Sequence, residues 1–179
     1  KSVQTLGIWD NVKRDLKAGE YLFIQFGHND SKADDPNRYA AAYGDYQTNL
    51  RIFIDHALSV GAKPVLSTPV SRRWFDDKGN LKVNCHGDYP DAVKQVAEEY
   101  GLPLIDANAV TQEWLIGLGD EPSRKYYMWI EKGTNPKHPE GKIDNTHTNA
   151  AGARKIVELL LPHIVKVIPE LAAHVVDYD

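Results

Sequence analysis

An aspartate and a histidine three residues apart, Asp144 and His147, precede the last apolar segment of the sequence. At this spacing a carboxylate can reach one imidazole nitrogen, fixing the tautomer while the other nitrogen acts as a general base. One alternative is that both are ordinary polar residues ahead of a helix N-terminus. A zinc site formed by His138, Asp144 and His147 is another, but these spacings match no recognised ligand pattern. We therefore expect no metal and no organic cofactor.

A second candidate is the tetrapeptide Gly27-His28-Asn29-Asp30, which directly follows an apolar run at 21–26. Glycine permits a sharp turn at the end of a strand, and an asparagine amide placed there can stabilise a developing oxyanion. The alternative is an ordinary turn, since Gly, Asn and Asp are the usual turn residues. Taken alone, the tetrapeptide favours the turn.

The elements that must position these residues alternate between strand and helix. The apolar run at 21–26 does not alternate with polar residues, which is typical of a strand buried on both faces of a parallel sheet. Strands are predicted at 21–26, 64–69 and 102–106, and helices at 8–17, 43–60, 88–100, 108–118 and 150–167. The polar, Pro- and Gly-punctuated stretch 119–146 is predicted to be a long functional loop. This order predicts an α/β sandwich with a parallel sheet, in which ligands sit at the carboxyl ends of the strands.

Composition narrows the function classes. The 179 residues are 42% hydrophobic and contain 21 Lys and Arg against 25 Asp and Glu, a net charge of −4. A chain without a basic excess is a poor partner for nucleic acid, and the sequence has no apolar run that suggests a membrane span. The single cysteine, Cys85, excludes a disulfide within these residues. We expect one domain over residues 1–179, with neither nucleic acid nor membrane as a partner.

Together, the two motifs resemble those of SGNH (GDSL-type) hydrolases. The run Tyr21–Asp30, the segment Thr68–Arg73 and the run Asp144–His147 are similar to the rhamnogalacturonan acetylesterase-like branch of that family. The stretch from Lys1 to Trp9 also resembles the sequence that follows the second motif block of this branch. The resemblance implies a three-layer α/β/α sandwich of flavodoxin-like type with a parallel sheet. It also implies a secreted or periplasmic serine esterase that removes O-acetyl groups from pectic or related acidic polysaccharide or oligosaccharide.

The resemblance also implies roles for individual residues. His147 would be the general base, Asp144 its orienting partner and Asn29 an oxyanion donor, with Gly27 and Asp30 framing the loop. His28 would line the substrate cleft, and Arg72 or Arg73 would pair with a uronate carboxylate, which suits the arginine fork; an exposed surface arginine is the alternative for either.

The sequence departs from the family at the nucleophile. The Gly-Asp-Ser block is absent from residues 1–179, so the nucleophilic serine and the N-terminal strand that would complete the sheet are expected in a segment before Lys1. Two alternatives remain open: a catalytically inactive, carbohydrate-binding relic of the same fold, and an esterase or lipase of this family that acts on another acyl ester.

Overall fold

The computed structural model describes residues 1–176 and divides the chain into two compact units. The first unit comprises Lys1–Pro69 and His86–Asp106, and the second comprises Val70–Cys85 and the chain from Ala107 onward. The expectation of a single domain stays a prediction.

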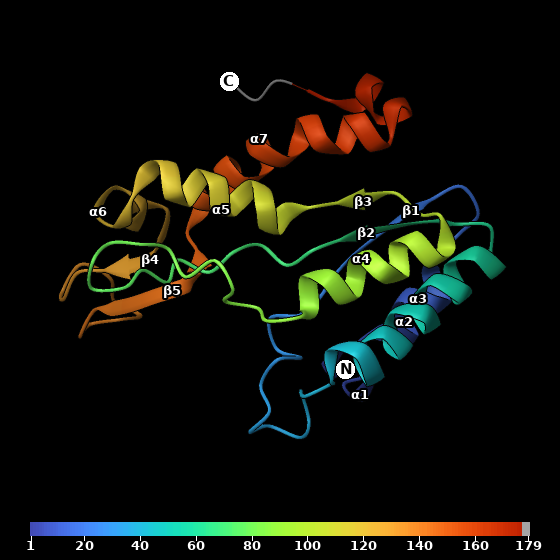
Figure 1. Ribbon diagram of the computed structural model, residues 1–179, viewed down its shortest axis with the longest axis horizontal. Helices are drawn as coiled ribbons and strands as arrows, with labels where there is room; N and C mark the ends of the chain where they lie inside the picture. Colours follow the sequence, from blue (N-terminus) through green and yellow to red (C-terminus); the bar gives the residue numbers. More distant parts are fainter. Residues whose placement is uncertain (177–179) are drawn as a thin grey trace. The chain divides into compact units, whose positions relative to one another are not determined.

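The first unit is built on a parallel three-stranded sheet in the order β1-β2-β3 (Figure 1). Its strands are β1 (Tyr21–Gln25), β2 (Lys63–Ser67) and β3 (Leu104–Ile105). Strand β1 pairs along its whole length with β2, from Tyr21 opposite Lys63 to Gln25 opposite Ser67. The three predicted strands are therefore confirmed, and because they are parallel their carboxyl ends lie at the same edge of the sheet.

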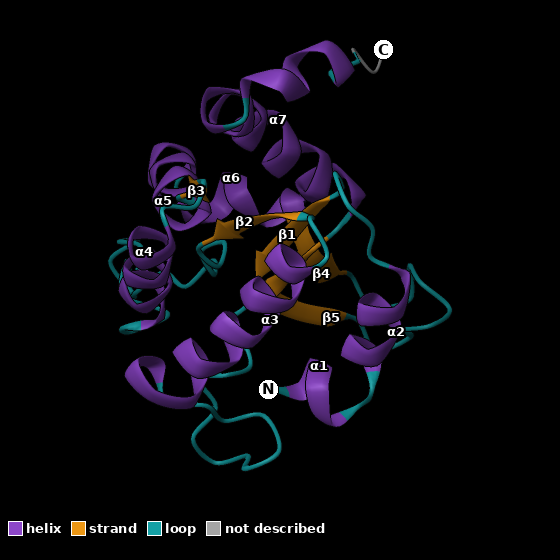
Figure 2. Cartoon of the chain, turned by 90° about the vertical axis from the view of Figure 1, so that its right-hand side faces the viewer, coloured by secondary structure: helices purple, strands orange, loops and turns teal. Residues whose placement is uncertain are grey.

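Helices pack against this sheet and form the core of the first unit. They are α1 (Ser2–Thr5), α2 (Ile8–Asp15), the short π-helical turn η1 (Ala42–Tyr46), α3 (Gln47–Ser59) and α4 (Tyr89–Tyr100). Figure 2 shows α3 and α4 side by side, and both contact β2. Alternate residues of β1, Leu22 and Ile24, point into the same cluster as Phe53 of α3 and Val93 of α4, so the period of two in the strand meets the apolar stripes of the helices.

The second unit contains mainly helices and one hairpin. Its helices are α5 (Ala107–Leu118), α6 (Asp120–Ser123), η2 (Arg124–Tyr126), α7 (Ala150–Val167) and η3 (Pro169–His174). Strands β4 (Tyr127–Ile130) and β5 (Lys142–Thr148) pair in antiparallel fashion. The loop predicted at 119–146 is thus wrong in part, because the four bulky residues of β4 find a partner strand 12 residues further along.

The hairpin contains a large bulge. Met128 lies opposite Asp144 and Tyr127 lies opposite Thr148, so one step along β4 corresponds to four steps along β5. The three extra residues, Asn145–His147, have no partner on β4 and must satisfy their backbone groups elsewhere.

Helix α7 begins directly after this bulge, at a tightly packed N-terminus. The side chain of Asn149 caps the helix by accepting the N–H of Gly152 at 3.0 Å, and its amide donates to the carbonyl of Lys125 at 2.7 Å. Gly152 is required here, because a Cβ at this position would overlap the carbonyl oxygen of Tyr126. Among residues 1–176, no helix is both long and apolar enough to cross a membrane.

Candidate active site

Asp144 and His147 are in direct contact in the second unit. Asp144 Oδ2 lies 2.8 Å from His147 Nδ1. The carboxylate side chain is 14% exposed and the imidazole is 75% exposed. A carboxylate next to Nδ1 favours the tautomer with its proton on that nitrogen, which leaves the lone pair of Nε2 as the acceptor. The exposed ring therefore has the arrangement of a general base with an orienting carboxylate.

The carboxylate of Asp144 is held in its charged form. Burial by itself would raise the pKa of Asp144. Hydrogen bonds to the carboxylate lower the pKa and outweigh that effect. They come from the backbone N–H groups of His147 and Thr146, each 2.9 Å from Oδ1, and from the side chains of Lys142 and His147. The result is a pKa for Asp144 well below the usual range, so the carboxylate is ionised at neutral pH.

Lys142 shares the oxygen that binds the imidazole. Its Nζ lies 3.0 Å from Asp144 Oδ2. Residues 142 and 144 lie on the same face of β5, because side chains alternate along a strand. The sequence motifs alone did not place this lysine beside the pair, although a cation two residues before the aspartate on a strand is a usable signal.

In the first unit, Gly27–Asp30 forms a closed turn at the end of β1. The N–H of Gly27 donates to Asp30 Oδ2 at 3.1 Å. Gly27 has φ 121°, in the region that favours glycine, and a Cβ there would lie 3.2 Å from the Pro69 ring. Asp30 is 4% exposed, whereas Asn29 at the tip of the turn is exposed. The two interpretations of the tetrapeptide are compatible, because the turn itself presents Asn29 to solvent.

The neighbours of this turn are rigid and aromatic. The His28 ring packs edge-on against that of His86, with centroids 4.5 Å apart. The hydroxyl of Tyr89 lies 2.7 Å from the carbonyl oxygens of both Asp30 and Ala40. Burial raises the pKa of Tyr89 to about 12, so this hydroxyl remains a donor. The turn is therefore fixed from the side of α4.

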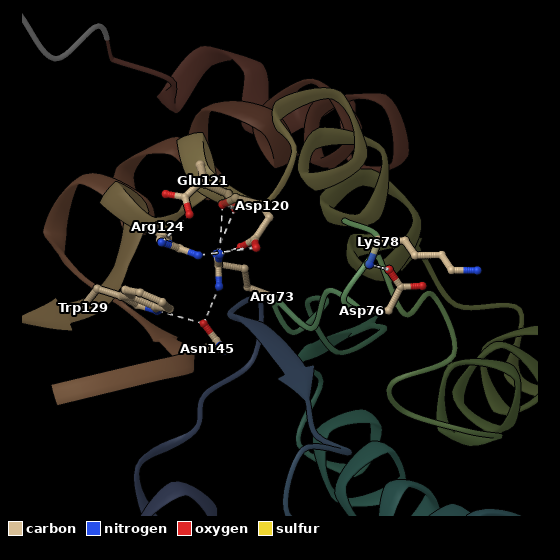
Figure 3. A network of polar contacts seen from close by, with 9 residues as sticks. Arg73, Asp76, Lys78, Asp120, Glu121, Arg124, Trp129 and Asn145 are labelled. Atoms are coloured by element: carbon tan, nitrogen blue, oxygen red, sulfur yellow. Dashed lines mark hydrogen bonds and ion pairs between the residues drawn. The ribbon is translucent and has the colours of Figure 1, made fainter. Parts of the chain in front are cut away.

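The two arginines expected at the substrate have different surroundings. Arg72 is partly exposed, and its guanidinium carbon lies 4.7 Å from the centre of the Trp74 ring. Arg73 is 2% exposed and is enclosed by acceptors of its own unit (Figure 3). Its guanidinium donates to Ser123 Oγ, to Asn145 Oδ1 and to both the carbonyl and the carboxylate of Asp120.

This set of partners differs from the uronate carboxylate expected for Arg73, because protein acceptors already occupy its three guanidinium nitrogens. Of the predicted site residues, Gly27, His28, Asn29 and Asp30 lie together in the first unit, and Arg72, Arg73, Asp144 and His147 lie in the second. Among the described residues, no group of three or more His, Cys, Asp or Glu side chains could hold a metal ion.

Comparison with known proteins identifies the family. The model of the GDSL-like lipase/acylhydrolase family matches residues 2–155. The chain belongs to this family. Its members are carboxylic ester hydrolases, and the matched residues include both the Gly27–Asp30 turn and the pair Asp144 and His147.

Two curated relatives place the chain in a branch of the family. It is 36% identical to the rhamnogalacturonan acetylesterase RhgT of Bacillus subtilis, over 94% of this chain and 70% of that protein. It is 33% identical to the probable rhamnogalacturonan acetylesterase YesY of the same organism, over 81% of this chain and 62% of that protein. The predicted membership of the rhamnogalacturonan acetylesterase-like branch of SGNH hydrolases is confirmed.

Solved structures agree on the fold. The chain superposes on protein YxiM of Bacillus subtilis with a TM-score of 0.73 at 23% identity, covering 92% of this chain and 42% of that one. It superposes on the acetylxylan esterase Axe2 of Geobacillus stearothermophilus with a TM-score of 0.60 at 17% identity, covering 92% and 67%. The predicted three-layer α/β/α fold with a parallel sheet is confirmed.

Proposed function

We propose that this GDSL-family hydrolase is a carbohydrate O-acetylesterase acting on acetylated, acidic polysaccharide of pectic type. The contact between Asp144 and His147 carries the proposal, because it gives a member of an ester-hydrolase family an oriented base with its acceptor nitrogen open to solvent. The names of the two curated relatives, a rhamnogalacturonan acetylesterase and a probable rhamnogalacturonan acetylesterase, support the substrate class. We also propose that the protein is secreted or periplasmic, because that location gives it access to a polymeric plant substrate.

The proposed reaction is acyl transfer in two steps. His147 Nε2 takes the proton of a serine hydroxyl as that oxygen attacks the acetyl carbonyl, and the imidazolium then protonates the departing sugar oxygen. A water molecule, deprotonated by the same nitrogen, then attacks the carbonyl carbon of the acetyl-serine. The bond from that carbon to the serine oxygen breaks, acetate leaves, and the imidazolium returns the proton to the serine oxygen. The serine is the one expected in the family's Gly-Asp-Ser block, and none of the six serines of residues 1–179 is assigned this role.

Further residues have roles in the same proposal. Asn29 donates its amide to the oxyanion, from the tip of the turn that Gly27 and Asp30 close. His28, which is in the same turn, is the residue that we propose for contact with the sugar substrate. Arg72 is the arginine that we propose for a uronate carboxylate, because Arg73 is already enclosed by protein acceptors.

Acetate release by the protein in the length encoded by its gene tests the proposal. Acetylated pectin and an aryl acetate are the substrates, and His147→Ala should lower the rate by about three orders of magnitude or more. Asn29→Ala should cost about a hundredfold. His138→Ala, on the connection between β4 and β5, is the matched histidine control.

Three results would count against the proposal. An unchanged rate in His147→Ala would remove the base from the mechanism. Binding of acetylated pectin without acetate release would favour a carbohydrate-binding relic. Hydrolysis of long-chain acyl esters in preference to acetates would favour a lipase.

A further inference from the structure

Three residues of β5 lie outside the strand pairing of the hairpin. Asn145–His147 form the bulge, which has no register partner on β4. Two of their N–H groups, those of Thr146 and His147, donate to the carboxylate of Asp144. These bonds fold the bulge back on itself but do not fix it to the rest of the unit.

Arg73 supplies the attachment. Its backbone N–H donates to the carbonyl of Asn145 at 2.8 Å, and its guanidinium donates to Asn145 Oδ1 at 2.5 Å. The same Oδ1 also accepts the indole N–H of Trp129, on β4, at 2.8 Å. Asn145 is thus bound at its carbonyl by the segment after β2. Its side chain is bound by that same segment and by the paired strand (Figure 3).

Arg73 is itself immobilised. The remaining guanidinium nitrogens bind Ser123 and Asp120, and the guanidinium carbon lies 5.0 Å from the centre of the Trp129 ring. Arg124 binds both Asp120 and Glu121, so two guanidinium groups face two carboxylates and the cluster carries no net charge. A buried arginine whose three nitrogens all donate to fixed acceptors has one low-energy position, which makes it a firm anchor.

We propose that Arg73 and Asn145 are positioning residues for His147, holding the bulge from which the imidazole projects. The inference rests on the proposed function, in which His147 is the base. Asn145 is adjacent to Asp144 and two residues from His147, so a shift of its backbone moves both members of the pair. A displacement of about 1 Å at a reacting group can cost about a hundredfold in rate.

The kinetic test uses Asn145→Ala in the gene-encoded protein. This variant removes the acceptor of both side-chain donors and leaves Asp144 and His147 in place. We expect kcat for aryl acetate hydrolysis to fall between about tenfold and a hundredfold, with KM changed less than about threefold. Asn135→Ala is the matched control, because Asn135 binds only the local backbone of the β4–β5 connection.

A graded series separates positioning from simple loss of packing. Trp129→Phe keeps most of the ring and removes one of the two hydrogen bonds to the Asn145 side chain, so a loss smaller than that of Asn145→Ala is expected. Arg73→Lys keeps the charge opposite Asp120 but cannot make all the guanidinium bonds at once, and should lie between them. Equal losses in all three variants, or full activity in Asn145→Ala, would overturn the inference.

Hydrogen exchange provides a readout that does not depend on activity. In Asn145→Ala the amides of Thr146 and His147 should exchange at least about tenfold faster, while the amide of Gly152 at the α7 cap keeps its rate. Wild-type exchange at Thr146 and His147, or uniformly faster exchange across the unit, would overturn positioning. His147→Ala in the acetate assay reads the proposed function by itself, so the two failures can be told apart.

Discussion

Replacing Lys142 by methionine should raise the pKa of the Asp144 carboxyl group. The Lys142 Nζ lies 3.0 Å from Asp144 Oδ2, and this contact is one of the interactions that hold the pKa of Asp144 below its usual range. The ammonium group favours the ionised carboxylate, and its charge is lost in Lys142→Met, so the sign of the shift is upward.

The geometry sets the size of the effect. Two opposite unit charges 3.0 Å apart in water attract each other by about 1.4 kcal/mol. Because the lysine side chain is 35% exposed, solvent screening and the cost of ordering the side chain reduce this interaction to about 0.5–1 kcal/mol.

A double-mutant cycle of Lys142→Met and Asp144→Asn in the gene-encoded protein measures this energy without requiring activity. Urea denaturation of wild type, the two single variants and the double variant at pH 7 should give a coupling energy of about 0.5–1 kcal/mol. At 1 M salt, where charges are screened over about 3 Å, the coupling energy should fall to less than about 0.3 kcal/mol. Lys132→Met is the control, because Lys132 pairs with Glu140 in the exposed β4–β5 connection.

The contact shown for Lys142 would be refuted by a coupling energy of zero between Lys142→Met and Asp144→Asn. An equal coupling energy between Lys132→Met and Asp144→Asn would show that net charge alone was responsible.

Three further changes test packing and charge by urea denaturation. Gly152→Ala should destabilise the protein by about 3 kcal/mol or more, because the methyl group overlaps a backbone carbonyl. Gly117→Ala is the control and should stabilise the protein by about 0.5–1 kcal/mol, because a methyl group there enters open space in α5. Equal effects of the two substitutions would contradict the packing at the start of α7. Tyr89→Phe should lower the free energy of unfolding by about 1–2 kcal/mol, because it removes a buried hydrogen bond of the hydroxyl group. Tyr100→Phe, which removes an exposed hydrogen bond, should lower it by less than about 0.5 kcal/mol. No change in Tyr89→Phe would show that the hydroxyl does not stabilise the turn after β1. The native pKa of Asp144 lies below its unfolded value, so its charged form stabilises the fold above about pH 4, and this contribution is lost as the pH falls below about 4. The difference in unfolding free energy between wild type and Asp144→Asn should therefore disappear as the pH falls below about 4. A difference that does not depend on pH would contradict the lowered pKa of Asp144.

The sequence predicts the parallel strands and the contact between Asp144 and His147, because both depend on local patterns. The apolar run of β1 and the stripe of α3 each follow from the period of a single element, and the spacing of Asp144 and His147 from one turn of chain. Gly27 was identified because a turn after a strand demands it.

The hairpin and the arginine cluster were missed for a different reason. Strand β4 contains four consecutive bulky residues, a strand signal, but the Pro- and Gly-rich stretch before β5 hides the pairing. The surroundings of Arg73 depend on Asp120 and Asn145, which follow it in the sequence by 47 and 72 residues, and no local pattern encodes such contacts. An arginine next to a strand end suggests a ligand, and only tertiary structure shows that its donors are already used.

The arginine cluster has a consequence for any attempt to transplant the Asp144–His147 pair. Arg73 belongs to a segment that leaves and re-enters the first unit, while its partners Asp120 and Asn145 lie beyond Ala107. A fragment starting at Ala107 would keep the signature residues but lose Arg73, which is one of the two guanidinium groups that bind Asp120 and the group that attaches the bulge. The segment Asp144–His147 therefore cannot be transferred by itself. A graft of β4 and β5 onto another protein must also include an arginine from a separate stretch of chain.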